Sequence, residues 1–139
     1  MSEQSEIFEK KLLIEKGLLG FETITNYSLT HADLEPFMWL KAEGEKNLAF
    51  LVVDPFILFS DYEIDVDDNS LSEIDIKNPS DVVVLTILTV SKTGEEPTAN
   101  LQGPVIVNKN NNKAIQVVLS DPRWMTKHSI TNQLETRGA

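Results

Sequence analysis

Short apolar runs separated by polar turns recur along this chain and predict a mainly β fold. Apolar and polar residues alternate over residues 27–32 and 37–42, and a denser apolar run covers residues 48–53 before it ends at Asp54-Pro55. Alternation with a period of two places every second side chain on the same face of a strand. We therefore expect three successive antiparallel strands in the first half of the chain.

The second half contains the most apolar run, residues 81–90, in which only two threonines separate the aliphatic side chains. Both faces of such a strand must be largely covered, so we expect it to be the central strand of the core. Two further runs, residues 105–108 and 114–119, flank the asparagine-rich residues 109–113. Asparagine tolerates left-handed backbone, which predicts a β-hairpin at this point.

Helix signals are scarce. Asn69 or Ser70 is expected to cap a short helix that runs to about Ile76. Glu73 stands three residues after Ser70, which is the spacing of a capping box. We therefore expect one short helix between the strands.

The tail after Pro122 is expected to form a short helical or irregular lid and then a polar end over residues 131–139 that frays; its apolar residues are Trp124, Met125 and Ile130. Many short strands with turn signals between them predict a closed or nearly closed antiparallel barrel or sandwich. We expect one mainly β, antiparallel β-barrel-like domain over residues 1–139, with an ordered core over about 6–130 and one or two short helices.

The composition is that of a soluble single domain. A chain of 139 residues, 41% hydrophobic and 24% charged, is long enough to build one core without disulfides or metals. No apolar run approaches the length of a membrane helix, and the acidic, polar start over residues 1–6 lacks the features of a secretory signal. Because there is no cysteine, disulfides, thiolate zinc sites and a cysteine nucleophile are excluded. We expect a cytoplasmic protein that does not enter membranes.

The charge is strongly negative and unevenly distributed. A formal net charge of -10 argues against direct binding to a nucleic acid, since that affinity rests mainly on Lys and Arg. From Asp61 to Asp81, eight acidic residues are opposed by one basic residue, Lys77. Two interpretations remain open: a solvated surface that keeps the protein soluble, or a surface that attracts a basic protein partner and speeds its docking.

No residue pattern supports catalysis. His31 and His128 lack metal-ligand neighbours at a standard spacing, so both are expected to be ordinary surface or loop residues. The run Asp61-x-x-x-Asp65-x-Asp67-Asp68 lacks the glycine and terminal glutamate of a calcium-binding loop, and the glycines form no phosphate-binding loop. We expect a protein that is not an enzyme and that holds no cofactor or metal.

The aromatic residues divide into two groups. Phe37, Trp39 and Phe50 are expected in the core, because each lies in a strand pattern with aliphatic neighbours. The run Phe56-Ile57-Leu58-Phe59, followed by Tyr62, stands directly before the acidic run. It either packs in the core or forms a partly exposed apolar anchor beside a charged rim, as protein-binding surfaces do.

The most distinctive stretch is residues 97–108, Pro-Thr-Ala-Asn-Leu-Gln-Gly-Pro-Val-Ile-Val-Asn. Pro97 and Pro104 fix φ and favour extended geometry in the residue before them, while Gly103 adds backbone freedom. Local chemistry predicts a strand-connecting corner in which Asn100 satisfies nearby backbone groups.

This stretch resembles the signature of the bacterial flagellar assembly factor FliW family: Asn-Leu, then Pro followed by an aliphatic run that ends in Asn. Three other segments agree with the family in order and spacing across roughly residues 6–130: Gly17-Leu18-Leu19-Gly20-Phe21, Leu48-Ala49-Phe50-Leu51-Val52-Val53-Asp54-Pro55 and Gln116-Val117-Val118-Leu119. Leu19 stands where the family usually has proline, which removes the argument for a rigid turn there. The resemblance implies a β-barrel-like fold.

The resemblance also implies a function. FliW-family proteins bind flagellin and the RNA-binding translational repressor CsrA, which represses flagellin synthesis. Free flagellin occupies the factor and leaves the repressor active; once flagellin is exported, the factor binds the repressor and relieves translation. The alternative is a flagellin-binding chaperone with no repressor contact. We expect a monomer when the protein is free, since a monomer that meets a dimeric repressor needs no self-interface.

The expected protein-binding residues come from two sources. The resemblance implies a shared surface at Asn100, Leu101 and Pro104, with Asp54, Pro55 and Tyr62 nearby in the motif order. Physical reasoning about the apolar run and the acidic run adds Phe56, Asp65, Asp67 and Asp68. The sequence does not assign individual residues to individual partners.

Overall fold

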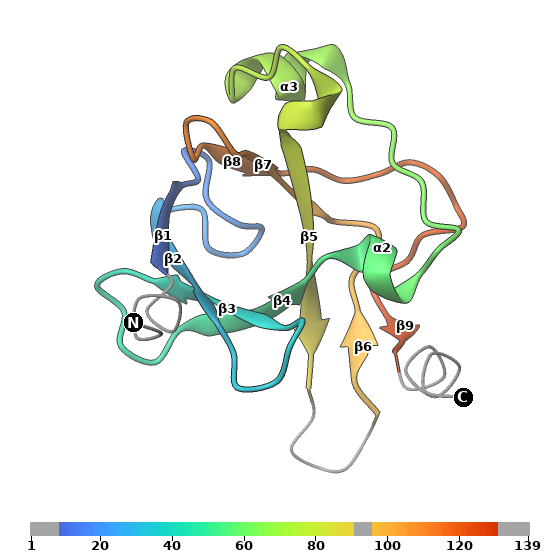
Figure 1. The fold of residues 1–139 in the computed structure, drawn as a ribbon, viewed down its shortest axis with the longest axis horizontal. Coiled ribbons are helices and arrows are strands. Elements are labelled where there is room, and N and C mark those ends of the chain that lie inside the picture. Colours follow the sequence, from blue (N-terminus) through green and yellow to red (C-terminus); the bar gives the residue numbers. More distant parts are fainter. Residues whose placement is uncertain (1–8, 91–95, 131–139) are drawn as a thin grey trace, which may run out of the picture.

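A computed structural model describes residues 9–90 and 96–130 (Figure 1). Its strands are β1 (Glu9–Leu13), β2 (Asn26–His31), β3 (Met38–Ala42), β4 (Ala49–Val53), β5 (Val82–Thr89), β6 (Thr98–Ala99), β7 (Val105–Asn108), β8 (Ala114–Gln116) and β9 (His128–Ser129). Its helices are α2 (Pro55–Leu58), α3 (Asp68–Glu73) and the 3-10 helix η1 (Pro79–Asp81).

The strands form one antiparallel sheet built around β5. The order is β1-β2-β3-β4-β5-β6-β9, and β7 pairs with a second stretch of β5 and with β8. β5 therefore has β4, β6 and β7 as partners, and its side chains from Val84 to Thr86 are buried. The prediction of a central strand is confirmed.

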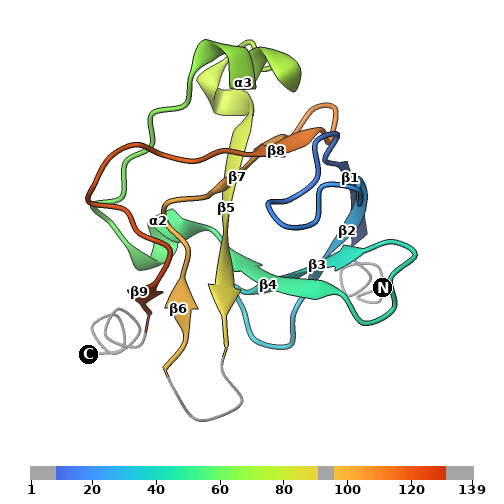
Figure 2. The same ribbon diagram turned by 180° about the vertical axis from the view of Figure 1, so that it is seen from behind.

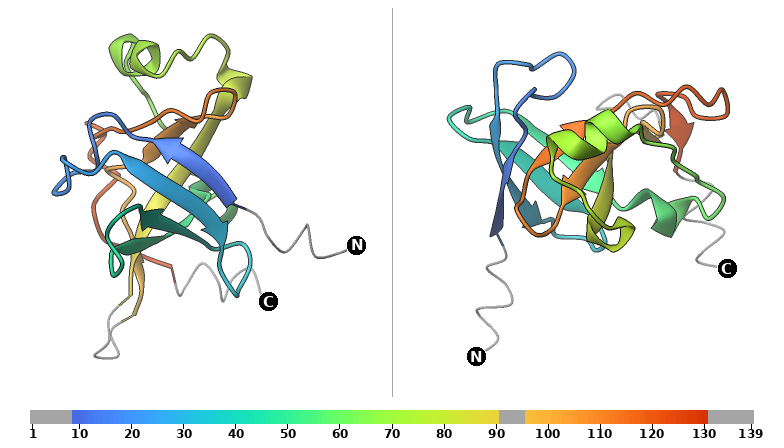
Figure 3. Two further views of the ribbon diagram at one scale, coloured as in Figure 1. Left: turned by 90° about the vertical axis from the view of Figure 1, so that its left-hand side faces the viewer. Right: turned by 90° about the horizontal axis from the view of Figure 1, so that it is seen from above.

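The sheet curls so that β1, at one end, approaches the β7–β8 hairpin (Figure 3). Leu13 at the end of β1 forms an isolated bridge to Lys113 beside β8, and the Leu13 N–H donates to the Asn112 carbonyl over 3.0 Å. One bridge does not close the ladder. The predicted fold class, a mainly β, antiparallel, barrel-like domain with few short helices, is confirmed.

Three apolar clusters stabilise the curled sheet. The first fills its interior around Tyr27, Leu40 and Leu85. The second packs α2 and the tail against Leu101. The third lies under α3 and has four buried members, Ile74, Val84, Ile106 and Ile115, edged by half-buried aliphatic side chains. Figure 2 shows α3 at one end of the molecule, above β7 and β8. The third cluster is therefore the least covered part of the core.

Most predicted strands have their expected positions. β2, β3, β4 and β5 lie within one residue of the predicted bounds, and β7 matches them. The prediction that residues 114–119 form one strand was too long, because β8 ends at Gln116 and residues 117–119 are irregular. β1 was missed because Glu9–Leu13 does not alternate, and β6 and β9 were missed because two-residue strands carry no pattern.

The helix predictions were partly wrong. α3 begins two or three residues earlier than expected, because the Asp67 carboxylate, not Asn69 or Ser70, caps it and accepts the Ser70 N–H over 2.7 Å. The predicted capping box with Glu73 is therefore wrong. α2 was missed, since Asp54-Pro55 was interpreted only as the end of a strand. Asp54 caps α2 and accepts the Phe56 N–H over 2.9 Å.

The hairpin over residues 109–113 is confirmed: β7 pairs with β8, and Asn112 has a φ of 63°. The tail is irregular and ends in β9, without a helix. Its Trp124 and Ile130 are buried and its Met125 is exposed. The predicted frayed end, residues 131–139, lies outside the described residues.

Five further predictions concern single side chains. Phe37 is buried as expected, and Phe50 is half-buried against the first cluster. The prediction that Trp39 is a core residue is wrong: it is 37% exposed, because in β3 it alternates with the buried Leu40. His31 ends β2 on the surface, whereas His128 is half-buried in β9 and is not a loop residue.

Candidate functional site

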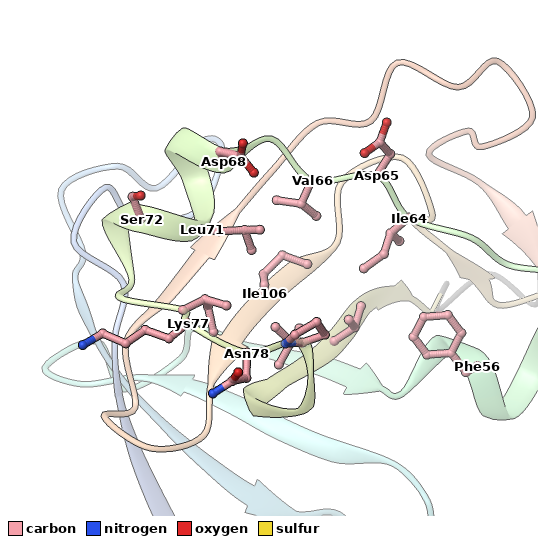
Figure 4. Close-up of a pocket in the computed structure, with 14 residues that line it drawn as sticks. Phe56, Ile64, Asp65, Val66, Asp68, Leu71, Ser72, Lys77, Asn78 and Ile106 are labelled. Atoms are coloured by element: carbon pink, nitrogen blue, oxygen red, sulfur yellow. The ribbon is translucent and has the colours of Figure 1, made fainter.

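An apolar groove of about 700 Å³ opens between α3, the segment 64–66 and the sheet. Figure 4 shows Ile64, Val66, Leu71 and Ile106 gathered along it, with Phe56 of α2 at one end. These aliphatic side chains belong to the third cluster. The groove is therefore the part of that cluster that no other segment of the described chain covers. Exposed concave apolar surface of this kind is characteristic of binding sites.

The groove keeps its shape because α3 is tied to the β7–β8 hairpin. Asn108 is buried, and its side-chain amide donates to the carbonyls of Ile74 over 2.8 Å and Asp75 over 3.2 Å. Asn111 adds a bond of 3.2 Å to the same Ile74 carbonyl. Because α3 has no fully buried residue of its own, these bonds at its C-terminal end fix its position over the sheet.

The rims of the groove differ in charge. Asp65 and Asp68 lie along one rim, while Lys77 and Asn78 lie on the other side (Figure 4). Within residues 9–90 and 96–130, no Lys or Arg forms an ion pair with Asp65, Asp67 or Asp68, although other members of the acidic run are paired. Those pairs are Glu63 with Arg123, Glu73 with Lys16 and Asp75 with Lys113. The groove therefore carries two carboxylates that have no ion-pair partner in that part of the chain, Asp65 and Asp68, with Lys77 on the opposite side.

The hydrogen bond that caps α3 also affects ionisation. The Ser70 N–H, aided by the Ser70 side chain, holds the pKa of Asp67 below its usual value. Asp67 is therefore a carboxylate at neutral pH. Together with Asp65 it also borders a second, smaller hollow of about 300 Å³ beside Ser120. The three aspartates thus extend the negative surface from the groove towards the tail.

The structure brings together part of the predicted site. Phe56, Asp65 and Asp68 all line the groove, and Asp67 lies beside it at the start of α3. Phe56 is 43% exposed, and its ring packs on that of Tyr62 with 5.6 Å between centroids. Of the predicted apolar anchor only Phe56 is exposed, because Leu58, Phe59 and Tyr62 are buried in the second cluster. That these residues contact a partner stays a prediction.

The other predicted residues have structural roles in the protein itself. Leu101, Pro104, Pro55 and Tyr62 are buried. The Tyr62 hydroxyl donates to the Leu101 carbonyl over 2.7 Å, and burial raises the pKa of Tyr62 well above its usual value. The Asp54 carboxylate caps α2 by accepting the Phe56 N–H. Any effect of these side chains on a partner is therefore expected to act through the surface they support.

Asn100 is half-buried at the corner between β6 and β7. Its side-chain oxygen accepts the Gly103 N–H over 2.9 Å, and its backbone N–H donates to the Ile87 carbonyl over 3.0 Å. The corner inserts residues 100–104 between the two strands that pair with β5. The local interpretation of Asn100, that it satisfies backbone groups at a strand-connecting corner, is confirmed.

Sequence reasoning missed the aliphatic side of the groove: Ile64, Val66, Leu71, Ile76 and Val82. One signal was available. Tyr62, Ile64 and Val66 alternate with acidic residues along the first part of the acidic run. Alternation directs apolar and acidic side chains to opposite sides of an extended segment. That pattern places the aliphatic side chains over the sheet and the carboxylates at the rim of the groove.

Two features are absent from the part of the chain that the structure describes. There, no three His, Asp or Glu side chains lie together in a group that could hold a metal ion. Within the same residues, no helix is both long and apolar enough to cross a membrane.

Comparison with known proteins identifies the family. The sequence model of the family described as "FliW protein" matches residues 2–130 of this chain. The chain belongs to the FliW family. Among curated FliW-family members, the flagellar assembly factor of Treponema denticola is 42% identical over 134 residues, which cover 96% of this chain and 91% of that protein. The flagellar assembly factor of Bacillus subtilis is 45% identical over 123 residues, 88% of this chain and 86% of that protein.

The fold agrees with this membership. A crystal structure of the flagellar assembly factor FliW superposes with a TM-score of 0.80 at 34% identity, covering 86% of this chain and 84% of that one. FliW-family membership supports a role in flagellum assembly, exerted through protein partners. The predicted family and the predicted fold are both confirmed.

Proposed function

We propose that this FliW-family protein is a non-enzymatic, cytoplasmic regulator of flagellum assembly. It binds the CsrA-type translational repressor and relieves the repression of flagellin translation, and it binds flagellin in a partner switch. The observation that carries the proposal is the groove whose floor is aliphatic and whose rim holds Asp65 and Asp68, neither of which has an ion-pair partner among the described residues.

Charge favours the repressor as one partner. A protein that holds RNA must present Lys and Arg to neutralise phosphates, so its surface is basic. Asp65, Asp67 and Asp68 form a negative surface that attracts such a partner over a distance of about 8 Å in physiological salt. The aliphatic floor then supplies the apolar contact that holds the complex together after encounter.

The partner switch requires that flagellin and the repressor exclude each other. Free flagellin occupies the protein and leaves the repressor on its RNA. When flagellin is exported, the vacated protein binds the repressor and translation resumes. A single groove with an aliphatic floor and charged rims gives such exclusion directly, because two partners cannot fill it at the same time.

A second candidate is a flagellin chaperone that never meets the repressor. The aliphatic floor favours it equally, since flagellin awaiting export also needs apolar surface covered. The acidic rim separates the two candidates, because a chaperone for an apolar surface gains little from three neighbouring carboxylates.

A mixture of purified protein, repressor and fluorescently labelled leader RNA tests the proposal by fluorescence anisotropy. Adding the protein should release RNA, and adding flagellin should restore the RNA-bound signal. If saturating protein releases no RNA while flagellin still binds it, the chaperone candidate replaces the regulator. If neither partner binds, both candidates fail. Bovine serum albumin at the same concentration serves as the control for non-specific effects.

A further inference from the structure

The segment of residues 63–73 crosses the third cluster, and we call it the strap. It runs outside the sheet, from the region after α2 to the end of α3 (Figure 1). None of its residues is buried, and its apolar side chains, Ile64, Val66 and Leu71, are only half-buried on the cluster. Segments with few buried apolar contacts open at a lower free-energy cost than core strands. The strap is therefore a wall of the groove that can move while the sheet stays folded.

Buried residues fix the strap at both ends. Tyr62 directly precedes it and is held by the bond of 2.7 Å from its hydroxyl to the Leu101 carbonyl. Ile74 directly follows it, and the Ile74 carbonyl accepts the side-chain amide of Asn108 over 2.8 Å. The next residue, Asp75, has a left-handed φ of 62°, which turns the chain away from α3. Two fixed ends with a change of backbone direction beside one of them are the arrangement of a hinged segment.

Hollows adjoin α3, the helical part of the strap, on several sides. The groove of about 700 Å³ is lined by its Asp68 and Leu71. A second hollow, of about 230 Å³, is lined by its Glu73 and by Ile115 of β8. The hollow of about 300 Å³ beside the tail is lined by its Ser70. Since protein interiors are normally filled, such space lets α3 shift without compressing the side chains around it.

One lysine connects α3 to the rest of the molecule. Lys16, in the loop after β1, forms an ion pair with Glu73. The hydrogen bond from Ser70 is the main cause of the lowered pKa of Asp67, and the charge of Lys16 adds to it. Lys16 therefore acts on both ends of α3. Its ion pair with Glu73 is exposed, and exposed ion pairs contribute little to stability, so this latch is easily released.

We infer that the strap is a lid, which lifts from the sheet as one unit and closes over a segment of the partner protein. This inference rests on the proposed function of the groove as a partner-binding surface. The segment is apolar where it lies on Val84 and Ile106 in the floor of the groove. It carries Lys or Arg against Asp65 and Asp68, which move with the strap.

Charge selects this occupant over a second copy of the chain. Each copy carries a net charge of -10 and places Asp65 and Asp68 at the groove, so two grooves that face each other bring like charges together. A basic segment neutralises the rim.

Amide hydrogen exchange measured by NMR on the whole chain tests whether the strap opens as a unit. The amides of Ser70 and Leu71 donate to Asp67 inside the strap, whereas those of Asn100 and Asn108 donate to the Ile87 and Lys113 carbonyls in the sheet region. In the free protein, both strap amides should be protected to the same degree and about tenfold or more less than the sheet amides. Saturating repressor or flagellin should remove this difference. Equal protection of strap and sheet in the free protein overturns the inference.

A covalent lock distinguishes a moving lid from a rigid wall. The chain has no cysteine, so Lys16→Cys with Glu73→Cys supplies the only two thiols, and a short bis-maleimide joins them in place of the ion pair. The locked protein should associate with the repressor about tenfold or more slowly than the same variant capped with N-ethylmaleimide. The matched control locks a remote ion pair, as Lys11→Cys with Glu43→Cys, and should associate at the same rate whether locked or capped.

The possible outcomes separate the inference from the function. If the locked and capped forms bind the repressor equally fast, the lid fails while the proposed function stands. If the unmodified protein binds neither partner, the proposed function fails and the inference fails with it. Strap protection that grows with protein concentration in the absence of any partner identifies a second copy as the occupant and overturns the inference.

A single substitution decides the case in which the capped variant itself does not bind. Glu73→Gln removes the latch, so the strap amides should exchange about twofold to fivefold faster while the Asn108 amide keeps its rate. Glu43→Gln breaks the ion pair with Lys11 and should leave the strap amides unchanged. Strap exchange that is unaffected by Glu73→Gln overturns the inference.

Discussion

The Tyr62 hydroxyl donates a hydrogen bond of 2.7 Å to the backbone carbonyl of Leu101, which joins the start of the acidic run to the corner between β6 and β7. The Tyr62 ring also packs edge-on against Trp124, with 4.8 Å between centroids. One side chain thus holds together the acidic segment, the family signature and the tail.

Tyr62→Phe is expected to lower the free energy of unfolding by about 1–3 kcal/mol, because the ring stays packed while the buried Leu101 carbonyl loses its partner. Urea denaturation followed by tryptophan fluorescence measures the change. Tyr27→Phe is the matched control: the buried Tyr27 hydroxyl has no hydrogen-bond partner among the described residues, so its removal should cost little or nothing. Equal losses for the two variants would contradict this account.

Asn108→Ala should detach the C-terminal end of α3 from the β7–β8 hairpin. The variant loses the bonds to the Ile74 and Asp75 carbonyls, and we expect a loss of about 1–3 kcal/mol in unfolding free energy. Partner affinity should fall as well, because α3 forms one wall of the groove. Asn110→Ala is the control, since Asn110 is exposed and its effect should stay within about 0.5 kcal/mol.

Neutralising Asp65, Asp67 and Asp68 to asparagine should slow association with the repressor by about tenfold at low salt. Asparagine at position 67 is still able to cap α3, so the fold should persist. The difference from the unmodified protein should shrink as salt rises, since screening removes the attraction. Stopped-flow measurement of the association rate at two salt concentrations gives the comparison.

The control for this charge experiment removes three exposed acidic residues on other loops, Asp33, Glu35 and Glu45, as Asp33→Asn, Glu35→Gln and Glu45→Gln. It changes the net charge by the same amount. If both triple variants slow association equally, only the overall charge matters and the rim has no special role. If neither slows it, the acidic run is a solvated face.

Gly17→Ala should destabilise the protein far more than Gly20→Ala. Both glycines have positive φ, 69° and 89°, so both substitutions strain the backbone by about 1 kcal/mol. A Cβ on Gly17 would also lie 2.6 Å from the Phe21 carbonyl oxygen, whereas nothing lies within 4 Å of a Cβ on Gly20. We expect an additional loss of about 2 kcal/mol or more for Gly17→Ala in urea denaturation. A smaller loss at Gly17 than at Gly20 would contradict the prediction.

Stability should fall as pH drops below about 6.5, through His128. Burial lowers the pKa of His128, against the opposing effect of Asp61, and Nε2 accepts the Met125 N–H over 2.8 Å, which requires the neutral ring. Since the unfolded chain takes up the proton more readily, the stabilisation is complete above the unfolded pKa and is lost as pH falls through the lowered folded one.

Urea denaturation at pH 7.5 and 5.5 measures this dependence, with His128→Gln as the comparison. The variant carries no titrating group at this position, so it should lose less stability between the two pH values than the unmodified protein. Asp61 and Arg123 line the same hollow as His128 and are unchanged in both proteins. Identical pH dependence in the two proteins would refute a role for His128.

Local patterns predicted most strands, since the alternation in residues such as those of β2 and β3 is a property of the strand itself. They failed where the deciding contact is distant in sequence. Trp39 fits an apolar strand pattern, but only the pairing of β3 with β2 and β4 puts Leu40 inside and Trp39 outside. Asn69, Ser70 and Asp67 are all competent caps, and the backbone path selected Asp67.

The sequence by itself determined the mainly β class, the central strand, the hairpin at residues 109–113, the clustering of negative charge and the family. Each of these depends on residue types along a short stretch or on motifs in a fixed order. Only the tertiary structure decided that Tyr62 and Leu101 are buried against each other and that Asp65 and Asp68 border an aliphatic groove. Burial and hydrogen-bond partners depend on which distant segments meet, and pairing between strands is set by the whole sheet.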